Sequence, residues 1–165
     1  MSSVTRDVPA GAGSRISRYL AADADTLALG AALAPHVAAG MVIYLSGELG
    51  AGKTTLARGV LRGLGHTGTV KSPTFALVEP YNLSRLYLYH FDFYRFTIPG
   101  ELAEAGFREY FRPDAICLVE WPENAAGMLP RADLKIELAA AGSGRQVEIT
   151  PGTEAGRLCL ERFNR

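Results

Sequence analysis

The sequence predicts an α/β fold with a mostly parallel central sheet, on the basis of three local patterns. An apolar run at residues 41–46 leads through a glycine-rich stretch into an amphipathic segment, which is the βα half of a right-handed βαβ unit. Residues 115–120 form a second apolar run that ends in an acid and is typical of a buried strand. Two alternating segments, residues 132–138 and 145–149, flank a Gly-Ser-Gly turn and predict a C-terminal hairpin at the sheet edge.

The glycine-rich stretch, residues 47–54, reads GELGAGKT and matches G-x-x-x-x-G-K-[ST] between a strand and a helix, as that pattern requires. Its glycines let the backbone wrap around a phosphate, which the loop N–H groups then bind at the positive end of the helix dipole. Lys53 can reach the β- and γ-phosphates, and the Thr54 hydroxyl can bind Mg²⁺. A glycine-rich turn that matches by chance is the alternative. The whole context favours a phosphate loop and predicts a three-layer P-loop NTPase fold.

Two acids end strands of the predicted sheet. Glu120 closes the buried run, where a carboxylate lies beside the phosphate loop and can hold Mg²⁺ or polarise the attacking water. Asp92 directly follows the segment 86–91, and alternation puts it on one face with His90 and Tyr94. The alternatives are a cap of the next turn for Glu120, and a cap or surface ion pair for Asp92. We interpret His90 as a structural histidine rather than a ligand.

A short polar loop offers a second contact to phosphate. Lys71, Ser72 and Thr74 supply a cation and two hydroxyls around a Ser-Pro step, which forces an extended backbone. These residue types suit a loop that senses phosphate, and an ordinary polar turn between two elements is the alternative.

Other elements follow from caps and breakers. We expect a strand at residues 16–20 and a helix at 26–33 that is capped by Asp23 or Asp25. Pro35 predicts either a kink in this helix or its early end, and a terminal helix is expected within 153–163. Strands are predicted at 75–79 and 86–91, joined by a turn at 81–85. A short helix is predicted at residues 99–105, because a proline and acidic residues occur in its first turn.

Composition limits the possible functions. Residues 1–14 are predicted to form a disordered tail, and residues 15–165 a single domain built around the P-loop. Lys+Arg and Asp+Glu both number 17, so a strongly basic nucleic-acid face is not indicated. No apolar stretch approaches the length of a membrane span. We therefore expect a cytoplasmic protein without membrane association.

The assembled motifs resemble the TsaE (YjeE) family of small bacterial P-loop ATPases, which act in making the threonylcarbamoyladenosine modification of tRNA. The resemblance spans about residues 22–149. Four blocks carry it in the family's order: LGAGKTT at 49–55, K-S-P-T-F at 71–75, H-x-D-x-Y-R at 90–95 and E-W-P-E at 120–123. Glu48 is a departure, because the family usually has Asp at that position.

The resemblance implies roles for individual residues. It implies ATP or ADP bound by the loop with Mg²⁺, Lys53 acting with Asp92 and Glu120 in catalysis, and Thr54, Asp92 and Glu120 as the metal-binding residues. Ser72 and Thr74 are implied to be a switch that senses the γ-phosphate. The implied nucleotide-binding residues are Glu48, Leu49, Gly50, Ala51, Gly52, Lys53, Thr54, Thr55, Thr26 and Arg145.

The resemblance also implies partners. The family docks with the TsaB–TsaD pair, and its ATP hydrolysis supports turnover of that tRNA-modifying complex. We expect an ATPase that is weak alone, with tRNA held only through the partners and an arginine finger supplied by Arg95 or by a partner. The alternatives are a small-molecule kinase, which the short segment 97–112 disfavours, and a nucleotide-gated binding module with negligible hydrolysis.

Overall fold

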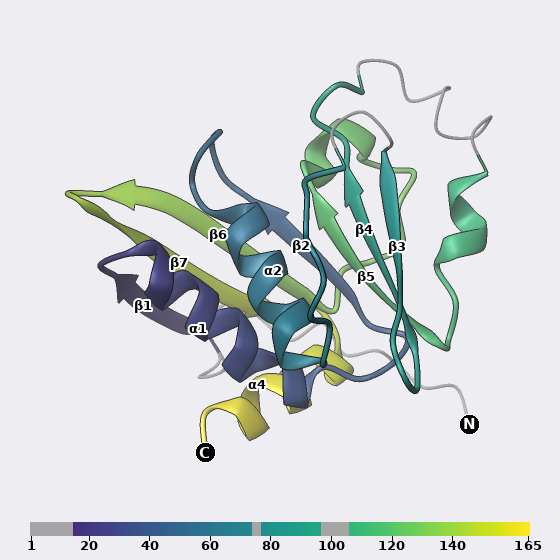
Figure 1. The fold of residues 1–165 in the computed structure, drawn as a ribbon, viewed down its shortest axis with the longest axis horizontal. Helices are drawn as coiled ribbons and strands as arrows, with labels where there is room; N and C mark the ends of the chain where they lie inside the picture. The colour runs from purple at the N-terminus through teal and green to yellow at the C-terminus, as the bar shows by residue number, and fades with distance from the viewer. Residues whose placement is uncertain (1–14, 74–76, 97–105) are drawn as a thin grey trace.

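The computed structural model describes residues 15–73, 77–96 and 106–165, and seven of its strands form one sheet in the order β1-β7-β6-β2-β5-β4-β3 (Figure 1). The strands are β1 (Ile16–Leu20), β2 (Val42–Ser46), β3 (Val78–Asn82), β4 (Tyr87–Asp92), β5 (Ala115–Glu120), β6 (Leu134–Ala141) and β7 (Gly144–Pro151). The described α-helices are α1 (Asp23–Leu33), α2 (Lys53–Gly63) and α4 (Glu154–Phe163). Three 3-10 helices, η1 (Ala34–His36), η2 (Phe107–Tyr110) and η3 (Pro122–Ala125), complete the described elements.

The predicted α/β fold is confirmed, and the sheet is more mixed than the sequence indicated. Its four central strands, β6, β2, β5 and β4, pair in parallel. The outer strands β3, β7 and β1 pair antiparallel. The β6–β7 hairpin therefore lies one strand inside the edge, because β1 pairs along the outer side of β7 in register from Ile16↔Ile149 to Leu20↔Arg145.

The two faces of the sheet are covered differently. Figure 1 shows α1 and α2 side by side against one face of the sheet. Cys159 and Leu160 of α4 belong to the same core, where they pack with apolar residues of the sheet and of α1. The opposite face carries an aromatic cluster around Phe91 and Phe93, with Phe107 and Ala125 from η2 and η3 packed against it. Among the described residues this third layer is made of short 3-10 helices.

Close packing of two glycines sets the position of α2, the helix that follows the phosphate loop. A Cβ at Gly30 would lie 2.4 Å from the carbonyl oxygen of Leu56 and 2.8 Å from the backbone nitrogen of Val60. A Cβ at Gly59 would lie 2.3 Å from the carbonyl oxygen of Leu27. The backbones of α1 and α2 can approach this closely only because both positions lack a side chain.

Most predicted elements are present, with shifted boundaries. The N-cap of α1 is Ala22, whose N–H donates to the Asp25 carboxylate at 3.0 Å, so neither aspartate is the cap residue itself. The β3–β4 turn is shorter than predicted, because pairing with β4 continues to Asn82↔Tyr87. Pro80 is tolerated in β3 because β3 is an edge strand.

Some predictions fall on parts of the chain that the structure does not describe. These are the tail at 1–14, the start of the strand predicted at 75–79, the short helix at 99–105, and the switch residue Thr74. No described helix has the length and apolar composition that a transmembrane helix needs.

Gly30→Ala tests the helix contact. We expect this change to lower the free energy of unfolding by about 1–3 kcal/mol, because the new methyl group meets the backbone of α2 and overpacks the interface. Urea unfolding measures the loss. Ala32→Ser, on the exposed side of the same helix, should change it by about 0.5 kcal/mol or less. A Gly30→Ala protein as stable as the wild type would contradict the packing argument.

Candidate functional site

The phosphate loop joins β2 to α2 and holds its shape through glycine conformations. Gly47 has φ 148° and Gly52 has φ 107°, in the region that favours glycine. A Cβ at Gly52 would also lie 2.0 Å from Nη1 of Arg145, and one at Gly47 would lie 2.4 Å from the carbonyl oxygen of Leu138. Both glycines are therefore required by backbone conformation and by space.

The N-terminus of α2 opens onto the pocket. The N-cap residue of this 11-residue helix is Gly52, which has no side chain to accept a hydrogen bond. The N–H groups of the first turn therefore receive no hydrogen bond from a capping side chain. The positive end of the helix dipole lies there as well. This arrangement suits an anion bound in the loop.

Lys53 is buried at the start of α2, with 5% of its surface exposed. Its Nζ donates to the carbonyl oxygens of Gly47 and, at 2.9 Å, of Glu48. The same ammonium lies 4.4 Å from the centroid of the Trp121 ring, a distance typical of a cation–π contact. In this state Lys53 is held by its own loop and by the tryptophan.

The pKa of Lys53 reflects two opposing effects. Burial, the larger effect, lowers the pKa because the charged form loses hydration. The negative charges of Glu120, Asp92, Glu123 and Glu48, in decreasing order, raise it. The net direction is downward, so the acids only partly offset the cost of burying the ammonium.

Glu120 is fixed by two side chains from other elements. The Thr54 hydroxyl lies 3.2 Å from each carboxylate oxygen. His90 Nε2 lies 2.6 Å from Oε2. The sequence pattern alone did not connect His90 to Glu120, although alternation placed it on the same face of β4 as Asp92.

Asp92 lies beside Glu120 because β4 and β5 pair in parallel with Asp92↔Glu120 in register. Its Oδ2 accepts a hydrogen bond from the Ser72 hydroxyl at 2.7 Å, and its Oδ1 accepts one from the backbone N–H of Tyr94 at 2.8 Å. The structure thus joins the predicted switch residue Ser72 directly to a predicted metal-binding acid.

Trp121 and Tyr94 form one wall of the site. Their rings are 5.0 Å apart, and Trp121 has φ 56°, a left-handed conformation that bulky residues rarely adopt. The conformation turns the chain sharply after β5 and begins η3. Backbone strain of this kind is concentrated at functional sites, which supports a role for this wall in the site.

Arg145 reaches the site from β7. Its Nη2 lies 2.6 Å from Oδ1 of Asp23 at the start of α1. Its Nη1 is buried against Gly52 and has no hydrogen-bond partner among the described residues. An unpaired guanidinium N–H beside the phosphate loop is a donor available for an anion.

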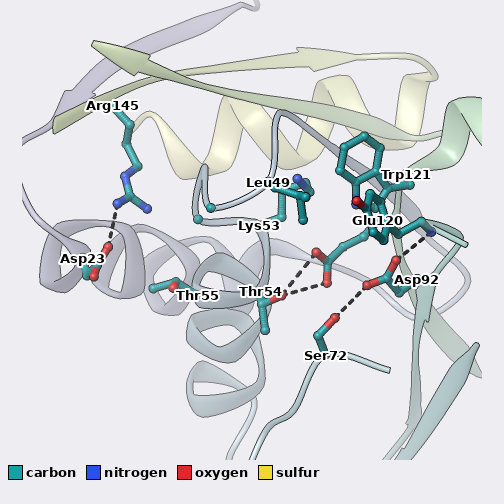
Figure 2. Close-up of a pocket in the computed structure, with 13 residues that line it drawn as sticks. Asp23, Leu49, Lys53, Thr54, Thr55, Ser72, Asp92, Glu120, Trp121 and Arg145 are labelled. Carbon is teal, nitrogen blue, oxygen red and sulfur yellow. Dashed lines mark hydrogen bonds and ion pairs between the residues drawn. The ribbon is translucent and has the colours of Figure 1, made fainter. Parts of the chain in front are cut away.

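These side chains surround a pocket of about 410 Å³, within the usual range for small-molecule sites (Figure 2). Figure 2 shows Asp23 and Arg145 at one end, Thr54 and Thr55 between, and the two acids with Trp121 at the other end. The lining residues are Asp23, Leu49, Gly50, Gly52, Lys53, Thr54, Thr55, Ser72, Asp92, Tyr94, Glu120, Trp121 and Arg145.

Most of the predicted site residues line this pocket, and three described ones do not. Glu48 and Ala51 belong to the phosphate loop without lining the pocket, and Thr26 is fully buried within α1. Asp23, Tyr94 and Trp121 line the pocket as well, and none of them was expected in the site from the sequence. Asp23 gave no signal, because an acid before a helix is ordinarily a cap.

The donor set fits a magnesium ion held together with phosphate oxygens. The described residues contain no group of three or more His, Cys, Asp or Glu side chains able to hold a metal by themselves. Mg²⁺ does not need such a cage, since it is usually bound through one or two carboxylates plus phosphates and waters. Thr54, Glu120 and Asp92 offer one hydroxyl and two carboxylates inside the pocket, with the Thr54 hydroxyl 3.2 Å from the Glu120 carboxylate.

The fold and the loop place this chain in the P-loop class of α/β proteins. The family model described as "Threonylcarbamoyl adenosine biosynthesis protein TsaE" matches residues 20–147, and the chain belongs to the TsaE family. A protein named tRNA threonylcarbamoyladenosine biosynthesis protein TsaE from Haemophilus influenzae is 46% identical over 129 residues, covering 78% of this chain and 82% of that protein.

Two further similarities come from Bacillus subtilis. Its protein of the same name is 40% identical over 139 residues, covering 83% of this chain and 87% of that protein. A crystal structure of YdiB superposes with a TM-score of 0.79 at 32% identity, over 92% of this chain and 95% of that one. Sequence and fold therefore agree on the family.

Glu120→Gln tests the electrostatics of Lys53. We expect the pKa of Lys53 to fall further, because removing this negative charge leaves burial less opposed. The sequence contains three lysines, so NMR titration of the lysine side chains can follow Lys53, with Lys53→Arg to assign its signal. Glu48→Gln, which removes the weakest of the four charges, should shift the pKa less. A rise in the pKa after Glu120→Gln would refute this account.

Proposed function

We propose that this chain is a Mg²⁺-dependent ATPase that supports threonylcarbamoyladenosine modification of tRNA by acting on a TsaB–TsaD complex. One observation carries the proposal: Lys53, Thr54, Asp92 and Glu120 line a single pocket that opens at the N-terminus of α2. Membership of the TsaE family supplies the biological context, through the names of the relatives.

The pocket gives the proposed nucleotide a direction. The acids and Lys53 favour the β- and γ-phosphates at their end, which leaves the end with Asp23 and Arg145 for the nucleoside. Lys53 would exchange the carbonyl oxygens of Gly47 and Glu48 for phosphate oxygens, which are stronger acceptors for an ammonium.

The roles of the acids follow from their contacts. Glu120 is hydrogen-bonded to Thr54, so the hydroxyl and one carboxylate are already together for a shared metal ion. Bound Mg²⁺ would offset negative charge on the phosphate oxygens. Either Glu120 or Asp92 orients the attacking water in this proposal. Arg95 is exposed and does not line the pocket, so an arginine finger supplied by a partner fits better than one from Arg95.

Lys53→Ala tests the hydrolysis. We expect the rate of phosphate release from ATP to fall by about 10²–10³-fold, because a preorganised cation is lost from the reacting phosphates. Lys135→Ala, which removes an exposed lysine on β6, is the matched control and should hydrolyse ATP as the wild type does. Product analysis should give ADP and inorganic phosphate.

Two results would overturn the ATPase. Unchanged ATP turnover in Lys53→Ala would show that the phosphate loop takes no part in the hydrolysis. A phosphorylated small molecule in place of inorganic phosphate would identify a kinase instead.

The hydrogen bond between Ser72 and Asp92 favours nucleotide gating of the partner interaction as well. A γ-phosphate near Asp92 would compete for the Ser72 hydroxyl and so change the position of the segment that carries it. In the proposal, partners respond to that segment. The partners also hold the tRNA, because a chain with 17 basic and 17 acidic residues has no excess of positive charge with which to bind nucleic acid.

Binding to purified TsaB and TsaD tests this gating. We expect capture of the complex to differ between ATP, ADP and no nucleotide, and the ATPase rate to rise when both partners are present. Ser72→Ala should reduce the difference between nucleotides, because it removes the hydroxyl that bonds Asp92. Equal capture in all three conditions would count against gating. Tight, salt-sensitive binding of tRNA by the isolated chain would contradict the role given to the partners.

A further inference from the structure

His90 contacts Glu120 from the neighbouring strand and does not itself line the pocket. It belongs to β4, where it is paired with Leu118 of β5, and Glu120 follows two residues later on the same face. Its side chain is fully buried, and it is not among the residues that line the pocket. Leu88 and Leu118, also fully buried, belong to the core on this face of the sheet.

The contact between His90 and Glu120 is short and shielded from water. Nε2 lies 2.6 Å from Oε2, with the two side chains 0% and 3% exposed. A buried carboxylate is costly unless donors compensate for its lost hydration. A ring N–H at this distance supplies such a donor, and in a buried site its hydrogen bond is stronger than it would be in water.

Thr54 alone would not orient this carboxylate. Its hydroxyl is 3.2 Å from both oxygens, so it does not distinguish Oε1 from Oε2. His90 does distinguish them, because it bonds Oε2 only. Oε1 keeps the Thr54 hydroxyl as its one hydrogen-bond partner among the described residues, and Glu120 is one of the residues that line the pocket.

The other ring nitrogen shows that His90 acts through this single bond. Nδ1 is buried and has no hydrogen-bond partner among the described residues. With the proton on Nε2, Nδ1 is an unprotonated acceptor and no N–H is left unpaired. Within the described part of the chain, the contact with Glu120 is therefore the polar contact that the ring makes.

We propose that His90 is a positioning residue, which holds Oε2 of Glu120 through Nε2–H and thereby leaves Oε1 oriented for the metal ion that Thr54, Asp92 and Glu120 would hold. This inference rests on the proposed function for its effect on turnover. It also predicts an effect on metal affinity that does not depend on turnover, because a hydrogen-bond donor to a metal-binding side chain fixes the orientation of that side chain.

The experiment compares two changes at position 90. His90→Leu keeps an apolar side chain of moderate size and removes the donor, whereas His90→Gln places an amide N–H near the position of Nε2. Electron paramagnetic resonance measures the affinity for Mn²⁺ in the presence of ADP, and phosphate release gives kcat and KM for ATP. We expect His90→Leu to weaken Mn²⁺ binding and to lower kcat by about 10–100-fold.

The same comparison predicts what should not change. KM for ATP and the affinity for ADP in the absence of metal should stay within about threefold of the wild type, since Lys53 and the loop are untouched. His90→Gln should recover most of the Mn²⁺ affinity and of kcat. If His90→Leu fails to fold, His90→Asn replaces it, because the shorter amide falls short of Glu120.

Leu88→Ala is the control for a purely structural effect. This residue lies two positions earlier on the same face of β4, and its truncation destabilises the core without touching the carboxylate. All variants are compared below their melting temperatures, as measured by circular dichroism. We expect Leu88→Ala to melt earlier and to keep its Mn²⁺ affinity.

Three results would overturn the inference: wild-type Mn²⁺ affinity in His90→Leu, failure of a folded His90→Gln to recover it, or an equal loss in Leu88→Ala. A wild-type protein that binds Mn²⁺ and ADP but hydrolyses no ATP would instead refute the proposed ATPase. The Mn²⁺ measurements would then decide the role of His90 by themselves.

Discussion

Parallel pairing of β2, β5 and β4 in fixed register is the constraint on which the site depends. Leu45 pairs with Glu120, and Glu120 pairs with Asp92, so the carboxyl ends of three strands meet at one edge of the sheet. The phosphate loop leaves β2 one residue later, after Ser46. A slip of one residue would turn either acid to the opposite face, so the apolar core that fixes the register also fixes the metal-binding end of the pocket.

The charged groups at that edge are buried, and each is compensated by a specific contact. Lys53 is held by loop carbonyls and by the Trp121 ring, Glu120 by Thr54 and His90, and Asp92 by Ser72. Ions in such surroundings interact more strongly than they would in water, and an unpaired one would be costly. The site therefore holds its acids in position before any ligand arrives.

Local patterns were sufficient wherever a residue's role depends on its immediate neighbours in the chain. The loop 47–54 and the acid at the end of β5 were predicted from spacing alone, because each belongs to one strand–loop–helix or strand–turn unit. The β3–β4 turn was misplaced, because hydrogen bonding to β4 extends the strand past the point where turn-forming residues begin. The hairpin was placed at the edge because nothing local to β1 indicates that it pairs with β7.

The sequence by itself determined the class of the fold, the phosphate loop and the two acids, since glycine conformation, apolar runs and strand ends are local properties of the chain. Only the tertiary structure decided what those groups touch. The contacts of Arg145 with Asp23, of His90 with Glu120 and of Lys53 with Trp121 each join residues that are far apart in the chain. Such contacts depend on strand order and on the close approach of α1 to α2, which arise from the packing of the whole core.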